Sequence, residues 1–316
     1  MNKNELIILY GEISNKKNFK QQLMIDENVT CMYREYAKQF GHIVYLSPQN
    51  IRYEWEHVIL KPIDVLKFIG EHPNAIIWSI KNSKTKDKFI LSKLPKYRKT
   101  MYYSCCSNNM YNKCVNYSLV DTDERIKKNA KLWFKGKDHN FWKYDETIKK
   151  NYDYVLIGLR GDKNEIYFIN NLTTKIKEKR NVLWIGGEKH KKKINKSHHN
   201  IKLMKRMGPN EIKDKIQLGK IGILFTELTV EGFPQSFLEM TMCGVPVIYN
   251  INVPRNEFYF KNNINCSFTN KKDLILNAEK LLNNYSEDIA QKCRDCAVEN
   301  YSLNRSFEFM KELSSI

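Results

Sequence analysis

Short apolar runs that are typical of buried strands alternate with helix-like segments along this chain. The apolar runs occupy residues 5–10, 42–46, 75–80, 100–103, 116–120, 154–159, 181–185, 201–204, 221–225 and 245–248. Helix-like segments occupy residues 33–39, 58–69, 166–176, 209–218, 272–282, 286–299 and 303–313. Because strands that alternate with crossover helices pair in parallel, the pattern predicts an α/β fold built on parallel sheets. No G-x-G-x-x-G follows the first run, so a standard dinucleotide site is not expected.

The length of 316 residues suits two domains, each large enough to bury its own core. A hydrophobic content of 42% and an aromatic content of 12% indicate a globular protein. Residues 145–151 are polar and have the character of a linker, so we place the domain boundary near residue 148. The predicted domains are therefore residues 1–148 and 149–300, followed by a last helix that begins near residue 301.

The formal net charge of +18 is high, and three explanations compete for it. The charge attracts nucleotide phosphates, or it favours contact with an acidic membrane or polymer, or it reflects a composition rich in lysine and asparagine. Net charge bears on steering and solubility, and not on fold or reaction. The lysines are spread along the chain, so we expect most of them on solvated faces, including the basic run at residues 189–196.

The 8 cysteines indicate a reducing compartment, because a chain of this length does not need disulfides and no secretory signal precedes it. Cys293 and Cys296 have C-x-x-C spacing, but no second pair follows, so we expect buried small side chains there. No run approaches the ~20 apolar residues of a membrane-spanning helix. We therefore expect a cytoplasmic protein, whose membrane contact, where it has one, is peripheral.

One stretch in the second half has the most specific local pattern in the chain. Gly232 and Pro234 break regular structure, which places Glu231 on a loop. Ser236 is a natural N-cap, and Glu239 follows three residues later, at the spacing of a capping box. The pattern predicts a short helix that begins at this point.

This helix is expected to end at Cys243, where Gly244 supplies a left-handed residue, and residues 245–248 then form a strand. Unpaired backbone N–H groups at the start of a helix favour an anion such as a diphosphate. One carboxylate precedes the helix and a second lies one turn inside it. A ligand with phosphates in the middle and hydroxyls at both ends, such as a nucleotide-sugar, suits this arrangement.

The pattern E-G-F-P-x-S-x-L-E-x-x-x-C-G-x-P-V-I resembles the donor-site signature of retaining glycosyltransferases of family 4. Residues 135–142 are similar to the family's N-G-V-D-x-x-x-F passage, with Gly136, Asp138 and an aromatic residue in register. The resemblance implies the GT-B fold, in which two Rossmann-like doubly wound parallel-sheet domains face each other across a cleft. It makes the first domain the acceptor side and the second the nucleotide-sugar donor side, with the last helix, 301–316, packed back on the first.

The resemblance also implies three catalytic side chains. Glu231 binds hydroxyl groups of the donor sugar, and Lys163 holds the diphosphate. The family's arginine position aligns with Gly158, so Arg160, two residues later, is the candidate for that role. Cations at these places stabilise the charge that develops on the leaving group. No histidine lies between residues 102 and 120, so the acceptor-domain histidine of the family is not assigned.

The second glutamate of the signature, Glu239, is implied to bind the ribose hydroxyls. The other implied donor-binding residues are Gly232, Phe233, Pro234, Gln235 and Ser236 around the helix start, Gly11 and Glu12 after the first strand, and Gly186 in a later turn. Ligands gather at the carboxyl ends of parallel strands, which is where these residues are expected. No metal is assigned, because the short Asp121-Thr122-Asp123 sequence is interpreted as a polar turn.

The implied reaction is the metal-independent transfer of a hexose from a nucleotide-diphosphate sugar, with retention and by a front-face mechanism. GDP-mannose is preferred as the donor over a UDP-sugar, and the acceptor is a glycan, glycoprotein or glycolipid. No cofactor and no nucleic-acid partner are expected, while peripheral membrane contact and a homodimer stay open. Two alternative functions remain: a GT-B sugar-nucleotide epimerase or phosphorylase, and a non-enzymatic basic protein that binds nucleic acid.

Overall fold

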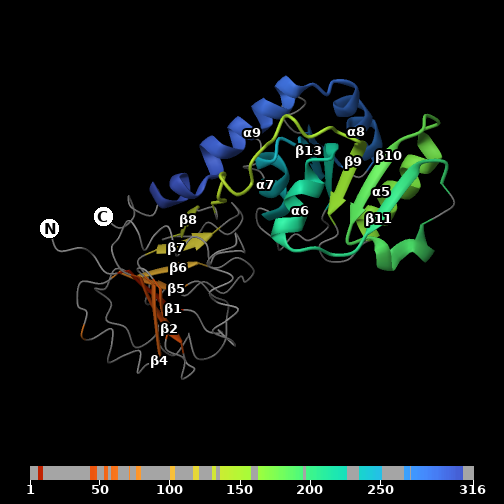
Figure 1. Ribbon diagram of the computed structural model, residues 1–316. Helices are drawn as coiled ribbons and strands as arrows, with labels where there is room; N and C mark the ends of the chain where they lie inside the picture. Colours follow the sequence, from red (N-terminus) through yellow and green to blue (C-terminus); the bar gives the residue numbers. More distant parts are fainter. Residues whose placement is uncertain are drawn as a thin grey trace. The chain divides into compact units, whose positions relative to one another are not determined.

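The computed structural model in Figure 1 describes the second half of the chain in most detail. In residues 1–135 it describes the strands and Glu71. Beyond them it describes residues 136–157, 163–194, 197–225, 235–250, 267–270 and 272–308.

The chain divides into two compact units. Unit 1 consists of Met1–Gly136, Val230–Phe233 and Leu303–Ile316, and unit 2 consists of Lys137–Thr229 and Pro234–Ser302. The donor and acceptor roles that the sequence suggests for the two halves stay predictions, as does the boundary near residue 148.

The described strands of unit 1 form an 8-stranded sheet in the order β3-β4-β2-β1-β5-β6-β7-β8. Its strands are β1 (Leu6–Leu9), β2 (Ile43–Ser47), β3 (Tyr53–Trp55), β4 (Val58–Pro62), β5 (Ile76–Ser79), β6 (Thr100–Tyr103), β7 (Tyr117–Val120) and β8 (Ala130–Leu132). Every pair is parallel except β3–β4. The sheet confirms the strands predicted at the positions of β1, β2, β5, β6 and β7.

Strand β4 corrects one prediction, because it occupies the first part of the segment that we expected to be helical. Val58 pairs with Ile43 on one side and with Trp55 on the other. The run Val-Ile-Leu is apolar and partly β-branched, which suits a strand that pairs with a neighbouring strand on each side. Pro62, the last residue of β4, cannot donate a ladder hydrogen bond and lies where the strand ends.

Unit 2 contains a 6-stranded sheet, within the described residues, in the order β11-β10-β9-β12-β13-β14. All of its pairs are parallel. Its strands are β9 (Tyr152–Ile157), β10 (Asn181–Ile185), β11 (Asn200–Met204), β12 (Gly219–Phe225), β13 (Val247–Asn250) and β14 (Ser267–Phe268). Two halves that spread outward from a central pair of strands make the Rossmann-type doubly wound order. This confirms the α/β prediction for the second half.

The helical segments of unit 2 connect these strands or follow the last of them (Figure 1). They are α5 (Lys163–Lys175), the 3-10 helix η2 (Glu188–Lys193), α6 (Pro209–Ile216), α7 (Gln235–Met242), α8 (Leu274–Asn283) and α9 (Glu287–Tyr301). α5, η2, α6 and α7 each follow the carboxyl end of a strand. Because the strands are parallel, these four helical segments begin at the same edge of the sheet, which we call the carboxyl edge.

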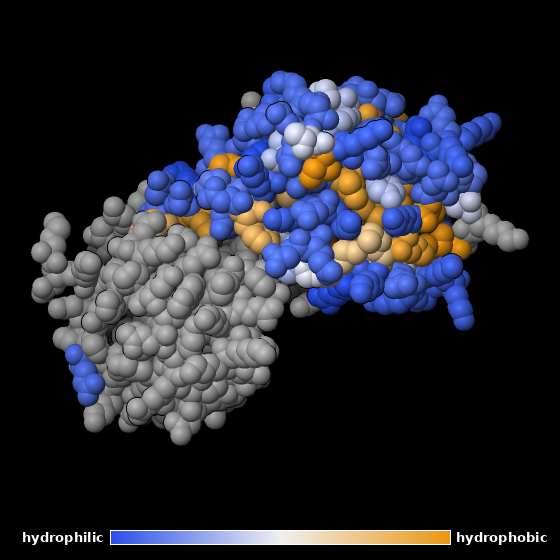
Figure 2. Space-filling model, viewed as in Figure 1, coloured by the Kyte–Doolittle hydropathy of each residue, from blue (hydrophilic) through white to orange (hydrophobic). Residues whose placement is uncertain are grey.

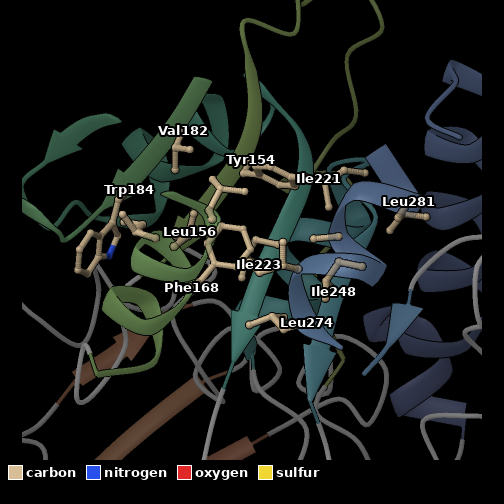
Figure 3. Close-up of a cluster of buried hydrophobic side chains, with 14 residues drawn as sticks. Tyr154, Leu156, Phe168, Val182, Trp184, Ile221, Ile223, Ile248, Leu274 and Leu281 are labelled. Atoms are coloured by element: carbon tan, nitrogen blue, oxygen red, sulfur yellow. The ribbon is translucent and has the colours of Figure 1, made fainter. Parts of the chain in front are cut away.

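A cluster of buried apolar side chains joins one face of this sheet to α5 and α8 (Figure 3). Tyr154 and Leu156 of β9 point to this face, as do Ile221 and Ile223 of β12. Alternate residues of a strand point to opposite faces, so the residues between them meet the helices on the other side. Helices α6 and α7 contact β12 there, and α9 packs on α7. The sheet is therefore covered on both faces, as a parallel sheet requires.

Helix α7 ends as the sequence predicts. Gly244 has a φ of 66°, in the left-handed region that glycine adopts without strain. Its N–H donates to the carbonyl of Thr241 at 3.0 Å, and the N–H of Val245 donates to Met240 at 3.0 Å. These two bonds form a Schellman motif, which satisfies the last carbonyls of the helix and aims the chain into β13.

The described surface of unit 2 is mostly hydrophilic on the face shown in Figure 2, with smaller apolar areas. Among the described residues, Leu276 on α8 is the large apolar side chain that stands exposed, at 68%. None of the described helices has the length and apolar character needed to cross a membrane.

Candidate functional site

The predicted site residues fall into two groups in the structure. The structure describes the surroundings of four of them: Gln235, Ser236, Glu239 and Gly186. Of Lys163 it describes the backbone, which begins α5. The other predicted positions lie outside the described residues, and their roles stay predictions: Gly11, Glu12, Arg160, Glu231, Gly232, Phe233 and Pro234. The Asp121-Thr122-Asp123 turn lies outside the described residues as well.

The start of α7 brings buried polar side chains to the carboxyl edge of the sheet. Ser236 is 2% exposed, and its hydroxyl has no hydrogen-bond partner in the described part of the chain. The side-chain oxygen of Gln235 is also buried and without a described partner. A buried polar atom that lacks a partner costs roughly 1–3 kcal/mol. The first N–H groups of a helix have no partner within the helix itself, so two such atoms at the start of α7 make a polar site suited to an anion.

The predicted capping box at this helix is wrong. Helix α7 begins at Gln235, so Ser236 lies inside the first turn and is not the N-cap. The carboxylate of Glu239, the other half of the proposed box, accepts a hydrogen bond from Lys137 instead. The tertiary partner replaces the local one, because a buried ammonium needs an anionic acceptor more than a backbone N–H does.

The Lys137–Glu239 ion pair contains the most deeply buried charged side chain among the ion pairs given for the described part of the chain. The Nζ atom of Lys137 lies 2.9 Å from Oε1 of Glu239. The side chain of Lys137 is 2% exposed and that of Glu239 is 17% exposed. Nζ also lies 5.3 Å from the centre of the Trp142 ring, at cation–π distance.

Lys137 belongs to a short loop, residues 137–142, whose backbone is tightly fixed. Its N–H donates to the carbonyl of Tyr301 at 2.9 Å, next to an isolated bridge between Lys137 and Ser302. Within the loop, the carbonyl of Asp138 accepts from the N–H of Trp142 at 2.9 Å. These backbone hydrogen bonds therefore hold Lys137 in place beside Glu239.

Arg294 of α9 ties this loop to the end of α7. Its guanidinium donates to the carbonyls of Trp142 at 2.9 Å and of His139 at 3.2 Å. It also donates to the carbonyl of Met242 in the last turn of α7. Burial lowers the pKa of Arg294. A planar, five-donor side chain can serve several carbonyls at once, so one residue links three segments.

Gly186 lies in the turn after β10, also at the carboxyl edge. Its φ of 87° is in the left-handed region, and its N–H donates to the carbonyl of Met204 at the end of β11, at 2.9 Å. His190 of η2 stacks on the buried Trp184, with ring centres 5.6 Å apart and an angle of 11°. The turn is thus fixed in place, whereas its predicted contact with a ligand stays a prediction.

The basic run after this turn confirms the expected solvated face where it is described. Lys191, Lys192 and Lys193 of η2 are exposed, whereas His190 is buried. Among the described residues, no group of three or more His, Cys, Asp or Glu side chains is placed to hold a metal ion. Cys243, at the end of α7, is buried, and burial raises the pKa of its thiol to about 12. It is therefore not a ready nucleophile.

No protein-family model and no curated protein matches the sequence. Solved structures do resemble it. A glycosyltransferase from Rickettsia africae has a TM-score of 0.73 and 13% identity, over 100% of this chain and 98% of its own. Anabaena HepE in complex with UDP-glucose has a TM-score of 0.68 and 11% identity, over 99% and 100% of the two chains. A sucrose-phosphate synthase from Thermosynechococcus elongatus has a TM-score of 0.68 and 8% identity, over 99% and 98%.

At these identities the likeness establishes the fold. It extends over nearly the whole of this chain and of each compared chain, so both units are included. The sheet order of unit 2 agrees with it. The chain has the GT-B fold of the glycosyltransferases that it resembles, which confirms the fold class predicted from the sequence.

Proposed function

We propose that the chain is a glycosyltransferase that takes a hexose from a nucleotide-diphosphate sugar. The observation that carries the proposal is the start of α7, at the carboxyl edge of a doubly wound sheet. There the buried Ser236 hydroxyl has no partner within the described residues, and Glu239 lies one turn further along the same helix. Ligands of such sheets bind at this edge, and phosphates bind at helix starts.

The proposed roles of the α7 residues follow from these positions, and those of Lys163, Arg160 and Glu231 follow from the sequence resemblance. The N–H groups and the Ser236 hydroxyl at the start of α7 bind the diphosphate, and Glu239 accepts hydrogen bonds from the ribose hydroxyls. Lys163 and Arg160 neutralise the leaving diphosphate, and Glu231 binds hydroxyls of the transferred sugar. Positive side chains and helix N–H groups stabilise developing charge in the way that a divalent ion does elsewhere. We therefore propose a metal-independent, front-face transfer with retention, in which the leaving phosphate takes the proton of the acceptor hydroxyl.

The donor base and the acceptor belong to the same proposal. GDP-mannose is the donor preferred from the sequence, and the HepE structure contains UDP-glucose, so these two donors are the first to compare. The proposed acceptor is a glycan, glycoprotein or glycolipid. A cytoplasmic location, peripheral membrane contact and a homodimer stay predictions.

Calorimetric titration of the full chain with UDP, UDP-glucose, GDP and GDP-mannose tests the proposal. We expect either UDP and UDP-glucose or GDP and GDP-mannose to bind. Glu239→Gln should weaken that binding by about 10- to 100-fold, because a hydrogen bond to a charged group is lost. Ser236→Ala is expected to weaken the binding of the diphosphate by about 10- to 100-fold, because its hydroxyl donates to a charged phosphate. Glu299→Gln on α9, at an exposed position, is the matched control and should bind as the parent does.

Activity assays separate the alternatives. With donor and acceptor, sugar transfer that persists in EDTA supports the metal-independent mechanism. Isomerised sugar, or phosphate-dependent cleavage with the donor alone, would instead support an epimerase or a phosphorylase. If none of the four nucleotides binds, the glycosyltransferase proposal fails. Binding to DNA that falls steeply with salt and ignores Glu239→Gln would then favour the nucleic-acid alternative.

A further inference from the structure

The two halves of the Lys137–Glu239 pair are unequally buried, and this suggests what the pair does. The lysine is 2% exposed and the glutamate 17% exposed, so the pair is open on the side of the carboxylate. Oε1 of Glu239 accepts from Lys137 at 2.9 Å, and no donor within the described residues reaches Oε2. One carboxylate oxygen is thus held by the protein while the other is left for a further donor.

A contribution to folding stability does not by itself explain why this ion pair is present. Removing two charges from water costs free energy that their attraction only partly returns, so an apolar pair of similar volume is often as stable or more so. The partners are separated by 102 residues along the chain. Lys137 is held by its backbone bond to Tyr301 and by the Trp142 ring, independently of α7. The loop therefore imposes one position on the glutamate side chain.

The position of Glu239 also creates an electrostatic problem that Lys137 solves. Glu239 lies one turn from the start of α7, where the proposed function places a diphosphate. A carboxylate so close to phosphates repels them, and the repulsion is strong where water is excluded. The ammonium group 2.9 Å away balances the negative charge. The carboxylate can then accept from hydroxyls without weakening the binding of the phosphates.

We propose that Lys137 is the positioning residue for ribose recognition: it fixes the carboxylate of Glu239 and compensates its charge, so that Glu239 binds the ribose hydroxyls of a nucleoside diphosphate. The inference rests on the proposed function, since it takes the ribose as the ligand of Glu239. Lys137 itself does not touch the ligand and acts through Glu239. Local sequence could not identify it, because its partner comes from a distant helix.

The test compares UDP with 2′,3′-dideoxy-UDP, and GDP with 2′,3′-dideoxy-GDP, by calorimetry on the full chain. The ratio of the two dissociation constants measures recognition of the ribose hydroxyls alone. We expect the parent to prefer the ribose form by about 10- to 100-fold, and Glu239→Gln to lose most of that preference. Lys137→Met should lose it too, while its affinity for the dideoxy form changes less.

The double variant Lys137→Met, Glu239→Gln separates positioning from a structural role. If Lys137 acts through Glu239, the double variant shows the same preference as Glu239→Gln alone. A structural role would lower the affinity for ribose and dideoxy forms equally. Lys137→Gln, which keeps a donor but removes the charge, is the second variant in case Lys137→Met does not fold, and its preference should fall between those of the parent and Glu239→Gln.

The outcomes distinguish this inference from the function beneath it. If the parent binds neither nucleotide, the proposed function fails and the inference fails with it. If the parent prefers the ribose form and Lys137→Met or Lys137→Gln keeps the full preference, the inference alone is overturned. Loss of preference in both single variants without a further loss in the double variant supports it.

Discussion

Replacing Arg294 by methionine removes the side chain that links the 137–142 loop to α7 and α9. Three carbonyls lose their donor: those of Trp142, at 2.9 Å, of His139, at 3.2 Å, and of Met242. A hydrogen bond from a charged donor contributes roughly 1.5–3 kcal/mol when it is well buried. Arg294 is half-buried, so water reaches part of the site, and we take about 1 kcal/mol for each bond. The expected destabilisation is therefore about 3 kcal/mol.

The assay is thermal unfolding of the full chain, followed by tryptophan fluorescence, because Trp142 is fully buried beside the lost bonds. A loss of about 3 kcal/mol corresponds to a fall in Tm of about 6–12 °C for a unit of this size. Lys292→Met on the same helix is the control. It breaks only the exposed ion pair with Asp288, whose partners are 57% and 68% exposed, and should cost at most about 1 kcal/mol. Equal Tm values for the two variants would refute the assigned role of Arg294.

Three further predictions concern the same unit. Gly244→Ala should destabilise it by about 2–4 kcal/mol in denaturant unfolding, because the residue is left-handed and a Cβ would lie 2.6 Å from the Tyr144 ring; unchanged stability would contradict the Schellman geometry. Burial lowers the pKa of His199, whose Nδ1 accepts the N–H of Arg180 at 3.1 Å. The neutral ring is thus favoured in the folded state, so the stability it contributes is complete above about pH 6.5 and is lost as the pH falls; His199→Gln should flatten this acid limb of a Tm-against-pH curve. Cys243 should resist a thiol reagent in the native protein and react on unfolding, since burial raises its pKa to about 12; rapid native labelling of Cys243, located by mass spectrometry, would contradict this.

Much of the fold could be predicted because each strand of a parallel sheet is a local signal. The runs at β9, β10 and β12 are short, apolar and rich in β-branched residues, and all were expected. Strands β3, β8 and β14 were missed, because segments of two or three residues are stabilised by the neighbouring strand and carry little pattern of their own. The sequence pattern over β4 predicts a helix, since a short apolar run fits both the helical and the strand periodicity.

The roles of the candidate site residues stay predictions, whereas the capping box predicted among them is wrong for a clear physical reason. Ser236 and Glu239 have the spacing of a capping box, and the local rule was applied to them. The structure shows the serine inside the helix and the glutamate bound to Lys137. Lys137 stands where the N-G-V-D pattern has valine, so the pattern assigns it no role. A contact between residues that far apart follows from the tertiary fold, which pattern and spacing do not reveal.

The hydrogen bond between Lys137 and Tyr301 has a consequence for how this architecture can be rearranged. The chain first enters unit 2 at Lys137 and last leaves it at Ser302, with Val230–Phe233 assigned to unit 1 between them, and Lys137 and Ser302 form a bridge. The entry and exit points thus coincide. A segment whose ends lie side by side can be inserted into a loop of another chain. It can also be circularly permuted, with its ends joined and new termini opened elsewhere.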